Sequence, residues 1–198
     1  SKSLKLYLNS FNQTRFDTVH HVFERLRTDL AKALGAELEL ELVGPDQFAN
    51  EKIHEFTGID LDKLDIVIDC YEPDANILKP HAGKLTQAYP EVSERLFSRL
   101  LKSNCPVTDQ PDWACIQIEY TGPAIDHASL LKYIVSYRMH NGFHEHCVEK
   151  ILVDILKQCA PTSLSVYARY TRRGGLDINP WRATFDVKPP AIGRSARQ

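Results

Sequence analysis

Cys105 and Asp112 are the residues of this sequence whose types and spacing first suggest chemistry. They lie in the stretch "SNCPVTDQPDW". Pro106 biases Cys105 to an extended backbone, and the polar residues that follow predict an accessible thiol, which becomes a nucleophile when it ionises. Asp112 lies seven positions later and reaches Cys105 only if the chain folds back. Two interpretations stay open: a nucleophile with its acid, or a cysteine and an aspartate that end an ordinary turn.

A second candidate group lies in "RMHNGFHEHCVEK". His140 and His144 have the i, i+4 spacing that can place two zinc ligands on one helix face. Gly142 lies between them and suits a helix start, which would break that face, and no HExxH pattern is present. The alternative is that His144 is a proton carrier and Glu145 a carboxylate directed at a ligand. We therefore predict no metal site.

A third group is the pair of arginines and glycines in "YTRRGGLDINPWR". Arg172 and Arg173 could fork phosphate oxygens, while Gly174 and Gly175 would let a ligand approach the backbone. A hairpin turn flanked by solvated arginines explains the same residues equally well. No GxGxxG follows a strand, so any dinucleotide would bind without a Rossmann unit.

Composition limits the setting of these groups. The chain has 198 residues and a formal net charge of −2, so no general basic field favours nucleic acid. No apolar run is long enough to span a membrane, and no signal-peptide pattern opens the chain. The cysteines are odd in number and none has CxxC spacing, which favours reduced thiols in a cytoplasmic protein. They are Cys70, Cys105, Cys115, Cys147 and Cys159.

The elements that must position these groups form a repeat. Apolar positions match at a constant offset of 126, as from Tyr7 to Tyr133, which indicates two copies of one supersecondary unit. In the first copy a helix runs from Val19 to Leu34 and ends at Gly35. The alternating "AELELELV" and the apolar "KLDIVIDCY" are then predicted as strands, the second closed by Cys70.

The second copy is predicted as strand, strand, helix, helix, strand, strand. Its strands include "WACIQIEY" and "LSVYARYTR", and its second helix carries the apolar stripe from Phe143 to Leu156. An antiparallel sheet with two helices on one face is an α+β architecture. We expect an incomplete N-terminal module over residues 1–84 and a C-terminal catalytic module over 85–198.

Together these motifs resemble the NADPH-dependent 7-cyano-7-deazaguanine reductases in their long, tandem-module form. The resemblance rests on "SKSLKLYLNSFN", "LLKSNCPVTDQPDW", "FHEHCVEKI" and "SVYARYTRRGGLDINPWR". It implies the tunnelling fold shared with GTP cyclohydrolase I. The implied reaction uses two NADPH to reduce the nitrile of 7-cyano-7-deazaguanine to an aminomethyl group, on the route to the tRNA nucleoside queuosine.

The resemblance also implies roles for individual residues. Cys105 would add to the nitrile carbon as a covalent thioimide, with Asp112 as proton donor and receiver. Ser1, His144 and Glu145 are expected to contact the substrate, and Ser1, Lys2, Arg173 and Gly174 to hold NADPH. A homodimer is expected from the way these modules associate.

One departure from the family pattern leaves alternatives open. The family's "SKS" block is preceded by a base-contacting glutamate and an upstream hairpin, and neither is in this chain. The alternatives are a truncated, non-catalytic module that binds a purine-like ligand, and a zinc-dependent, cyclohydrolase-like hydrolase.

Overall fold

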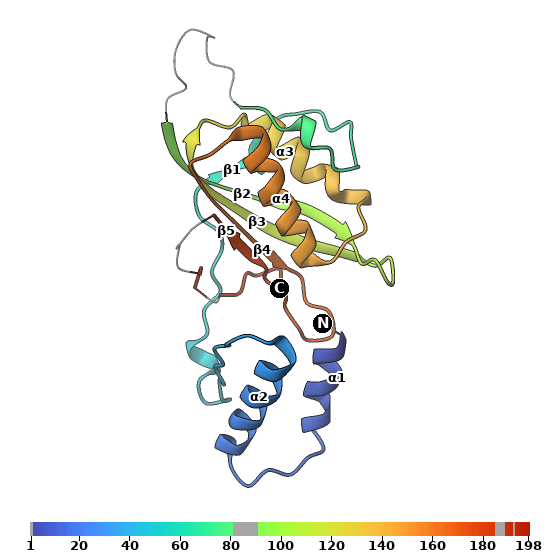
Figure 1. Cartoon of the computed structure of the whole chain (residues 1–198), viewed down its shortest axis with the longest axis vertical. Helices are drawn as coiled ribbons and strands as arrows, with labels where there is room; N and C mark the ends of the chain where they lie inside the picture. The colour runs from blue at the N-terminus through green and yellow to red at the C-terminus, as the bar shows by residue number, and fades with distance from the viewer. Residues whose placement is uncertain (1, 81–90, 185–188, 192) are drawn as a thin grey trace. The chain divides into compact units, whose positions relative to one another are not determined.

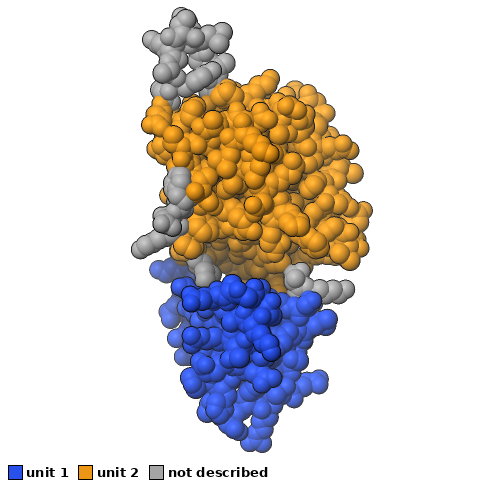
Figure 2. All heavy atoms as spheres, viewed as in Figure 1, with its two compact units in different colours: residues 1–52 blue, residues 53–198 orange. Residues whose placement is uncertain are grey.

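The computed structural model describes residues 2–80, 91–184, 189–191 and 193–198. The chain divides into two compact units, Ser1–Lys52 and Ile53–Gln198 (Figures 1 and 2). Residues 53–80 therefore belong to the C-terminal unit, a packing that the expected division at residue 84 did not anticipate. The division into two functional modules stays a prediction.

The first unit contains two helices, α1 (Lys2–Phe11) and α2 (Val19–Leu34). The predicted limits of α2 are confirmed. Thr18 caps its start by accepting a hydrogen bond from the His21 amide, and Gly35 ends it in the left-handed conformation at φ 64°.

A side-chain lock joins the two helices of the first unit. The Tyr7 hydroxyl donates a 2.9 Å hydrogen bond to Asp29, which also accepts one from Arg25. The Tyr7 ring meets Phe11 edge to face, with centroids 5.1 Å apart. No residue described in this unit is fully buried.

Both strands predicted in the first copy are wrong. Residues 36–43 and 64–71 are in neither a strand nor a helix. An alternating sequence forms a strand only where a neighbouring strand accepts its backbone hydrogen bonds, and the described residues supply none here. Cys70 consequently closes no strand. It is partly exposed, and its thiol donates to the Glu72 carbonyl.

The second unit is built on a five-stranded sheet in the order β1-β2-β3-β4-β5. The strands are β1 (Ile59–Asp60), β2 (Glu91–Asn104), β3 (Pro111–Pro123), β4 (Ser163–Tyr170) and β5 (Trp181–Ala183). All neighbours are antiparallel except β1 and β2. The predicted strands "WACIQIEY" and "LSVYARYTR" are confirmed as β3 and β4, and the Trp181 indole donates to Ser165 across β4 and β5.

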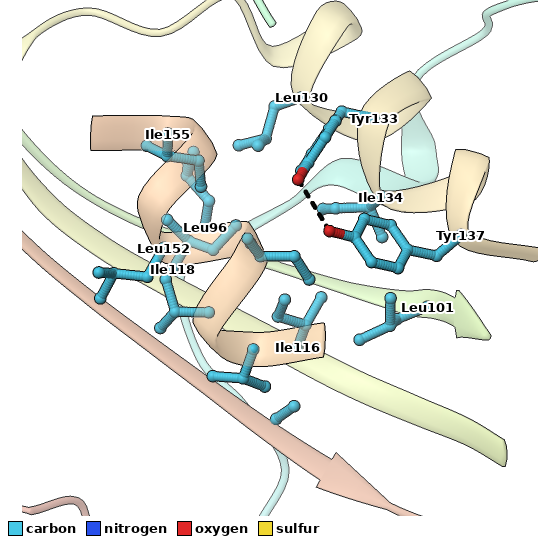
Figure 3. Close-up of a cluster of buried hydrophobic side chains, with 14 of the residues drawn as sticks. Leu96, Leu101, Ile116, Ile118, Leu130, Tyr133, Ile134, Tyr137, Leu152 and Ile155 are labelled. Carbon is cyan, nitrogen blue, oxygen red and sulfur yellow. Dashed lines mark hydrogen bonds between the residues drawn. The ribbon is translucent and has the colours of Figure 1, made fainter. Parts of the chain in front are cut away.

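Helices α3 (His127–Ser136) and α4 (His144–Cys159) cover one face of this sheet (Figure 1). The predicted α+β class is confirmed. The core lies between the helices and the sheet, as Figure 3 shows. Its fully enclosed side chains include Leu96, Leu101, Ile116, Ile118, Leu130, Ile134 and Ile151.

The second helix pair repeats the lock of the first. Tyr133 donates to Asp154 at 2.6 Å, and Lys150 donates to the same carboxylate. The Tyr133 and Tyr137 rings meet edge to face at 5.5 Å, and their hydroxyls share the hydrogen bond drawn in Figure 3. The two tyrosines lie at the offset of 126 from Tyr7 and Phe11. The aromatic pair thus recurs at the offset of the sequence repeat, whereas Asp154 and Lys150 lie 125 positions after Asp29 and Arg25. No helix among the described residues is both long and apolar enough to cross a bilayer.

Candidate functional site

The candidate site forms where β2 turns into β3. Residues 105–110, here called the nucleophile loop, make this turn, and Ser103 pairs with Asp112 across the two strands. The Cys105 amide donates to the Gln110 carbonyl, and the Asp109 amide donates to the Cys105 carbonyl, both at 2.9 Å. The chain therefore folds back as the approach of Asp112 to Cys105 requires.

Asp112 is buried, with 3% of its surface exposed, yet it lies beside two nitrogen donors. The Arg173 guanidinium donates to Oδ1 at 3.1 Å, and His144 Nε2 lies 3.1 Å from Oδ2. A buried carboxylate needs such partners because losing water without replacement bonds is costly. Asp112 is thus a buried carboxylate held by Arg173 and His144, and it does not merely end a turn.

His144 reaches Asp112 because the start of α4 is tied to the end of β2. The Asn104 amide donates to the His140 carbonyl at 2.8 Å, and the Gly142 amide donates to the Asn104 carbonyl at 3.0 Å. The His144 ring stacks on Tyr170 of β4, with centroids 3.9 Å apart and planes 13° from parallel. The positive end of the α4 dipole also faces this region and favours anions.

Cys105 carries a perturbed thiol. A hydrogen bond from the Thr108 side chain, another from the Arg173 side chain and bonds from the backbone of Val107 and Thr108 lower its pKa to about 6. Each of these donors stabilises the thiolate more than the thiol. The thiol is partly exposed, so a small electrophile can reach it. These are the conditions for a reactive cysteine at neutral pH.

The histidines and cysteine of "RMHNGFHEHCVEK" are not arranged as the zinc interpretation requires. His140 precedes α4, which begins at His144, so the two histidines share no helix face. Cys147 is buried behind the site, and this burial raises its pKa. Among the described residues, no three or more His, Cys, Asp or Glu side chains are grouped to hold a metal ion.

The arginine–glycine motif forms the hairpin turn that sequence allowed. The Arg173 amide donates to the Leu176 carbonyl at 3.1 Å, and Gly174 and Gly175 have φ of 63° and 84°, values suited to glycine. The flanking arginines are not simply solvated. Arg172 pairs with Asp177, whereas Arg173 turns into the nucleophile loop.

Comparisons with known proteins cover both ends of the chain. A family model described as "QueF-like protein" matches residues 111–188, and one described as "Nitrile reductase, 7-cyano-7-deazaguanine-reductase N-term" matches residues 1–42. Proteins named NADPH-dependent 7-cyano-7-deazaguanine reductase match all of this chain and 70% of their own length. They are 57% identical in Bordetella pertussis and 54% identical in Paraburkholderia phymatum. This chain belongs to that reductase family.

The solved structure of an archaeosine synthase QueF-Like in the apo form aligns with a TM-score of 0.44 and 18% identity. It covers 52% of this chain and 100% of that one.

For this reductase-family chain, the structure brings Cys105, Asp112, His144 and Arg173 into one site. Glu145 lies in the first turn of α4, exposed, and its carboxylate makes no hydrogen bond or ion pair within the described residues. Gly174 lies in the adjoining turn. Lys2 is the first residue of α1, and Ser1 lies outside the described residues.

Sequence reasoning missed two residues of the site. Thr108 was noted only as a polar neighbour in the loop, because a contact between its hydroxyl and sulfur depends on how the loop turns. Tyr170 falls within the predicted strand "LSVYARYTR", and it is fully buried. One sequence signal pointed to a role in the site: Tyr170 is the last residue of β4 and lies two positions before the Arg172–Gly175 motif.

Proposed function

We propose that this chain reduces the nitrile of 7-cyano-7-deazaguanine to an aminomethyl group through a covalent thioimide on Cys105, with NADPH as reductant, in queuosine biosynthesis. The observation that carries the proposal is the Cys105 thiol, whose pKa is lowered to about 6 beside the buried Asp112. A thiol with this pKa is mostly thiolate at pH 7. Membership of the reductase family supplies the substrate and the cofactor.

The proposed first step is addition of the thiolate to the nitrile. The sulfur forms a bond to the nitrile carbon, one carbon–nitrogen π bond opens, and the nitrogen takes up one proton. The Asp112 carboxylate would take up that proton from His144, whose Nε2 lies 3.1 Å away, and pass it to the nitrogen. Addition turns a poor hydride acceptor into a C=N unit that accepts hydride readily.

The substrate is expected to be held from the start of α4. Glu145 presents an exposed carboxylate with no hydrogen bond or ion pair within the described residues, and an ionised carboxylate accepts hydrogen bonds from the donor-rich edge of a guanine-like base. His144 lies next to it and is stacked on Tyr170, so its ring has a fixed plane. Ser1 is the third expected substrate contact.

Two hydrides are needed, and NADPH is the group that would supply them. The first would reduce the thioimide carbon, the carbon–sulfur bond would then break so that Cys105 leaves as thiolate and an imine remains, and the second would reduce that imine to the amine. The residues present fit a phosphate-bearing group: the Arg172–Gly175 turn carries two guanidinium groups, and a Cβ built on Gly175 would meet nothing within 4 Å. We assign Ser1, Lys2, Arg173 and Gly174 to the cofactor.

The test is intact-protein mass spectrometry after mixing the chain with 7-cyano-7-deazaguanine without NADPH. We expect a mass gain of one base, absent in Cys105→Ala, and loss of that gain when NADPH is added. Tight binding of the base with no mass gain would contradict the proposal and favour a non-catalytic binding module.

Cellular setting and assembly are further parts of the proposal. We propose a cytoplasmic homodimer with a small deazapurine substrate, no direct nucleic-acid partner and no membrane partner. Light scattering over a range of protein concentrations tests the dimer, and a monomer at every concentration would contradict it.

A further inference from the structure

Arg173 makes more contacts with the nucleophile loop than a cofactor ligand needs. Its Nη2 donates to Thr108 Oγ1 at 3.1 Å and also to Gln110 Oε1. Its Nη1 donates to Asp112 Oδ1 at 3.1 Å and lies 3.5 Å from Oδ2. The side chain also lowers the pKa of the Cys105 thiol. One guanidinium therefore bonds the proposed acid and two residues of the loop that carries the proposed nucleophile.

The adjacent arginine shows that this placement is specific. Arg172 precedes Arg173 in the same turn, but its guanidinium pairs with Asp177 and not with the nucleophile loop. The hairpin turn at Gly174 and Gly175 lets consecutive side chains take separate directions. The chain thus offers a matched cation, one residue away, with different partners.

We propose that Arg173 is a catalytic residue of nitrile addition, whose guanidinium holds the Cys105 thiolate and the Asp112 carboxylate together in one site. This role rests on the proposed function and goes beyond cofactor binding. Two anions placed side by side disfavour each other's ionisation, and a cation between them removes that penalty. A forked guanidinium suits the task because it donates to both groups in fixed directions.

The other charged groups around Cys105 do not replace Arg173. His144 contacts Asp112 from α4, and its ring is occupied by that carboxylate and by the stack on Tyr170. Asp109 lies in the loop itself and accepts a hydrogen bond from Asn141. Thr108 donates to the sulfur but carries no charge. Among the described groups that lower the pKa of the Cys105 thiol, Arg173 is the one that carries a charge.

The chemistry also explains how one residue could serve twice. Addition consumes the thiolate, because the sulfur becomes a neutral thioether-like atom when it bonds to carbon and the nitrogen takes the proton. The hydrogen bond from Arg173 to sulfur then loses most of its strength. The guanidinium is free to exchange that partner for a cofactor phosphate before hydride transfer.

The test measures how alkylation of Cys105 by iodoacetamide depends on pH in the full chain, with neither substrate nor cofactor. Peptide mass spectrometry, with fragmentation to separate Cys105 from Cys115, follows the reaction. We expect a midpoint near pH 6 for the unsubstituted chain. In Arg173→Met the midpoint should rise by at least about one pH unit, and Arg172→Met should leave it unchanged.

Arg173→Lys keeps the charge without the fork, so its midpoint should lie between those of the unsubstituted chain and Arg173→Met. Circular dichroism establishes that each variant is folded. An unmoved midpoint in folded Arg173→Met, with normal adduct formation by the unsubstituted chain, would overturn the role of Arg173 and leave the proposed function standing. A raised midpoint with no adduct in the unsubstituted chain would instead overturn the proposed function and keep Arg173 as the partner of the thiolate.

Discussion

At the scale of single residues, Asp112 and Cys105 differ in their exposure to solvent and in the neighbours that hold them. Asp112 is buried and held by Arg173 and His144, whereas Cys105 is partly exposed and takes its hydrogen bonds from a loop and a turn. The carboxylate is therefore rigidly placed and the thiol is accessible. The proposed reaction, which starts by adding sulfur to a planar substrate, needs both properties.

Thr108→Val should raise the pKa of Cys105, because it removes the hydroxyl that stabilises the thiolate and keeps the side-chain shape. The sign follows from the lowered pKa: the unsubstituted thiol protonates below about pH 6, so adduct formation falls there. In the variant that fall should begin at a higher pH. The measurement is adduct rate against pH, with Thr171→Val, a threonine outside the loop, as the control. Identical profiles for Thr108→Val and the unsubstituted chain would refute the assignment.

Tyr170→Leu should slow adduct formation, because it removes the ring on which His144 stacks. A small displacement of a catalytic group costs about ten- to a hundredfold in rate. Tyr170→Phe keeps the stack and should react nearly as fast as the unsubstituted chain. The measurement is adduct rate together with thermal melting of each variant. Equal rates in a folded Tyr170→Leu would show that the stack has no role in placing His144.

Residue types predicted part of this site. Cys105 was identified by its loop and His144 by its place near a helix start, and the structure puts both at one end of the sheet. The roles of Thr108 and Tyr170 in the site could not be predicted in the same way. Their contacts join segments far apart in sequence, and periodicity reports only which face of an element is apolar.

At the scale of elements, the ends of the helices show how local sequence sets structure. Both α2 and α4 end in the left-handed conformation, α2 at Gly35 and α4 at Ala160, which has φ 47° and ψ 47°. Glycine adopts this conformation without penalty, whereas alanine does so at a cost.

Ala160→Gly should therefore stabilise the chain by about 1 kcal/mol. Gly35→Ala is the matched reverse change. A Cβ at Gly35 would meet no atom within 4 Å, so the strained backbone alone should destabilise α2 by about the same amount. Urea unfolding measures the first effect and helical circular dichroism the second. A destabilised Ala160→Gly would mean that the alanine methyl packs usefully, contrary to this account.

The elements predicted wrongly share one cause. The alternation over residues 36–43 and the apolar run over 64–71 are real patterns, and yet neither segment pairs with a described strand. A strand is stabilised by its partner, and sequence pattern does not say whether a partner is present. Helices satisfy their own backbone groups, which is why the limits of α2 were predicted correctly and those strands were not.

At the scale of the whole molecule, the two units differ in how much they bury. α4 has seven buried residues, six of them in the hydrophobic core of the second unit, whereas α2 has none. Helices in proteins owe most of their stability to packing of an apolar face rather than to intrinsic propensity. The repeat offset of 126 could be read from the sequence, but the difference in burial could not.

Amide hydrogen exchange should consequently be faster in Val19–Leu34 than in His144–Cys159. The difference follows from local opening, which costs little where few apolar contacts are lost. Exchange followed by mass spectrometry on the full chain gives the comparison. The hydrogen bond from Tyr7 to Asp29 should slow exchange in α2 enough for its rate to be measured. Equal protection in the two helices would contradict the difference in packing.

Both tryptophans of the chain, Trp113 and Trp181, lie in strands of the second unit, on either side of β4. Tryptophan fluorescence, excited selectively at a wavelength that tyrosine does not absorb, therefore reports on that unit alone, and Trp113 follows Asp112 directly, next to the nucleophile loop. Ellipticity at helical wavelengths sums over both units, including the four α-helices of the described residues. Melting curves recorded by the two signals should separate if the units unfold independently, which makes a standard spectrometer sufficient to assign any variant's damage to one unit or the other.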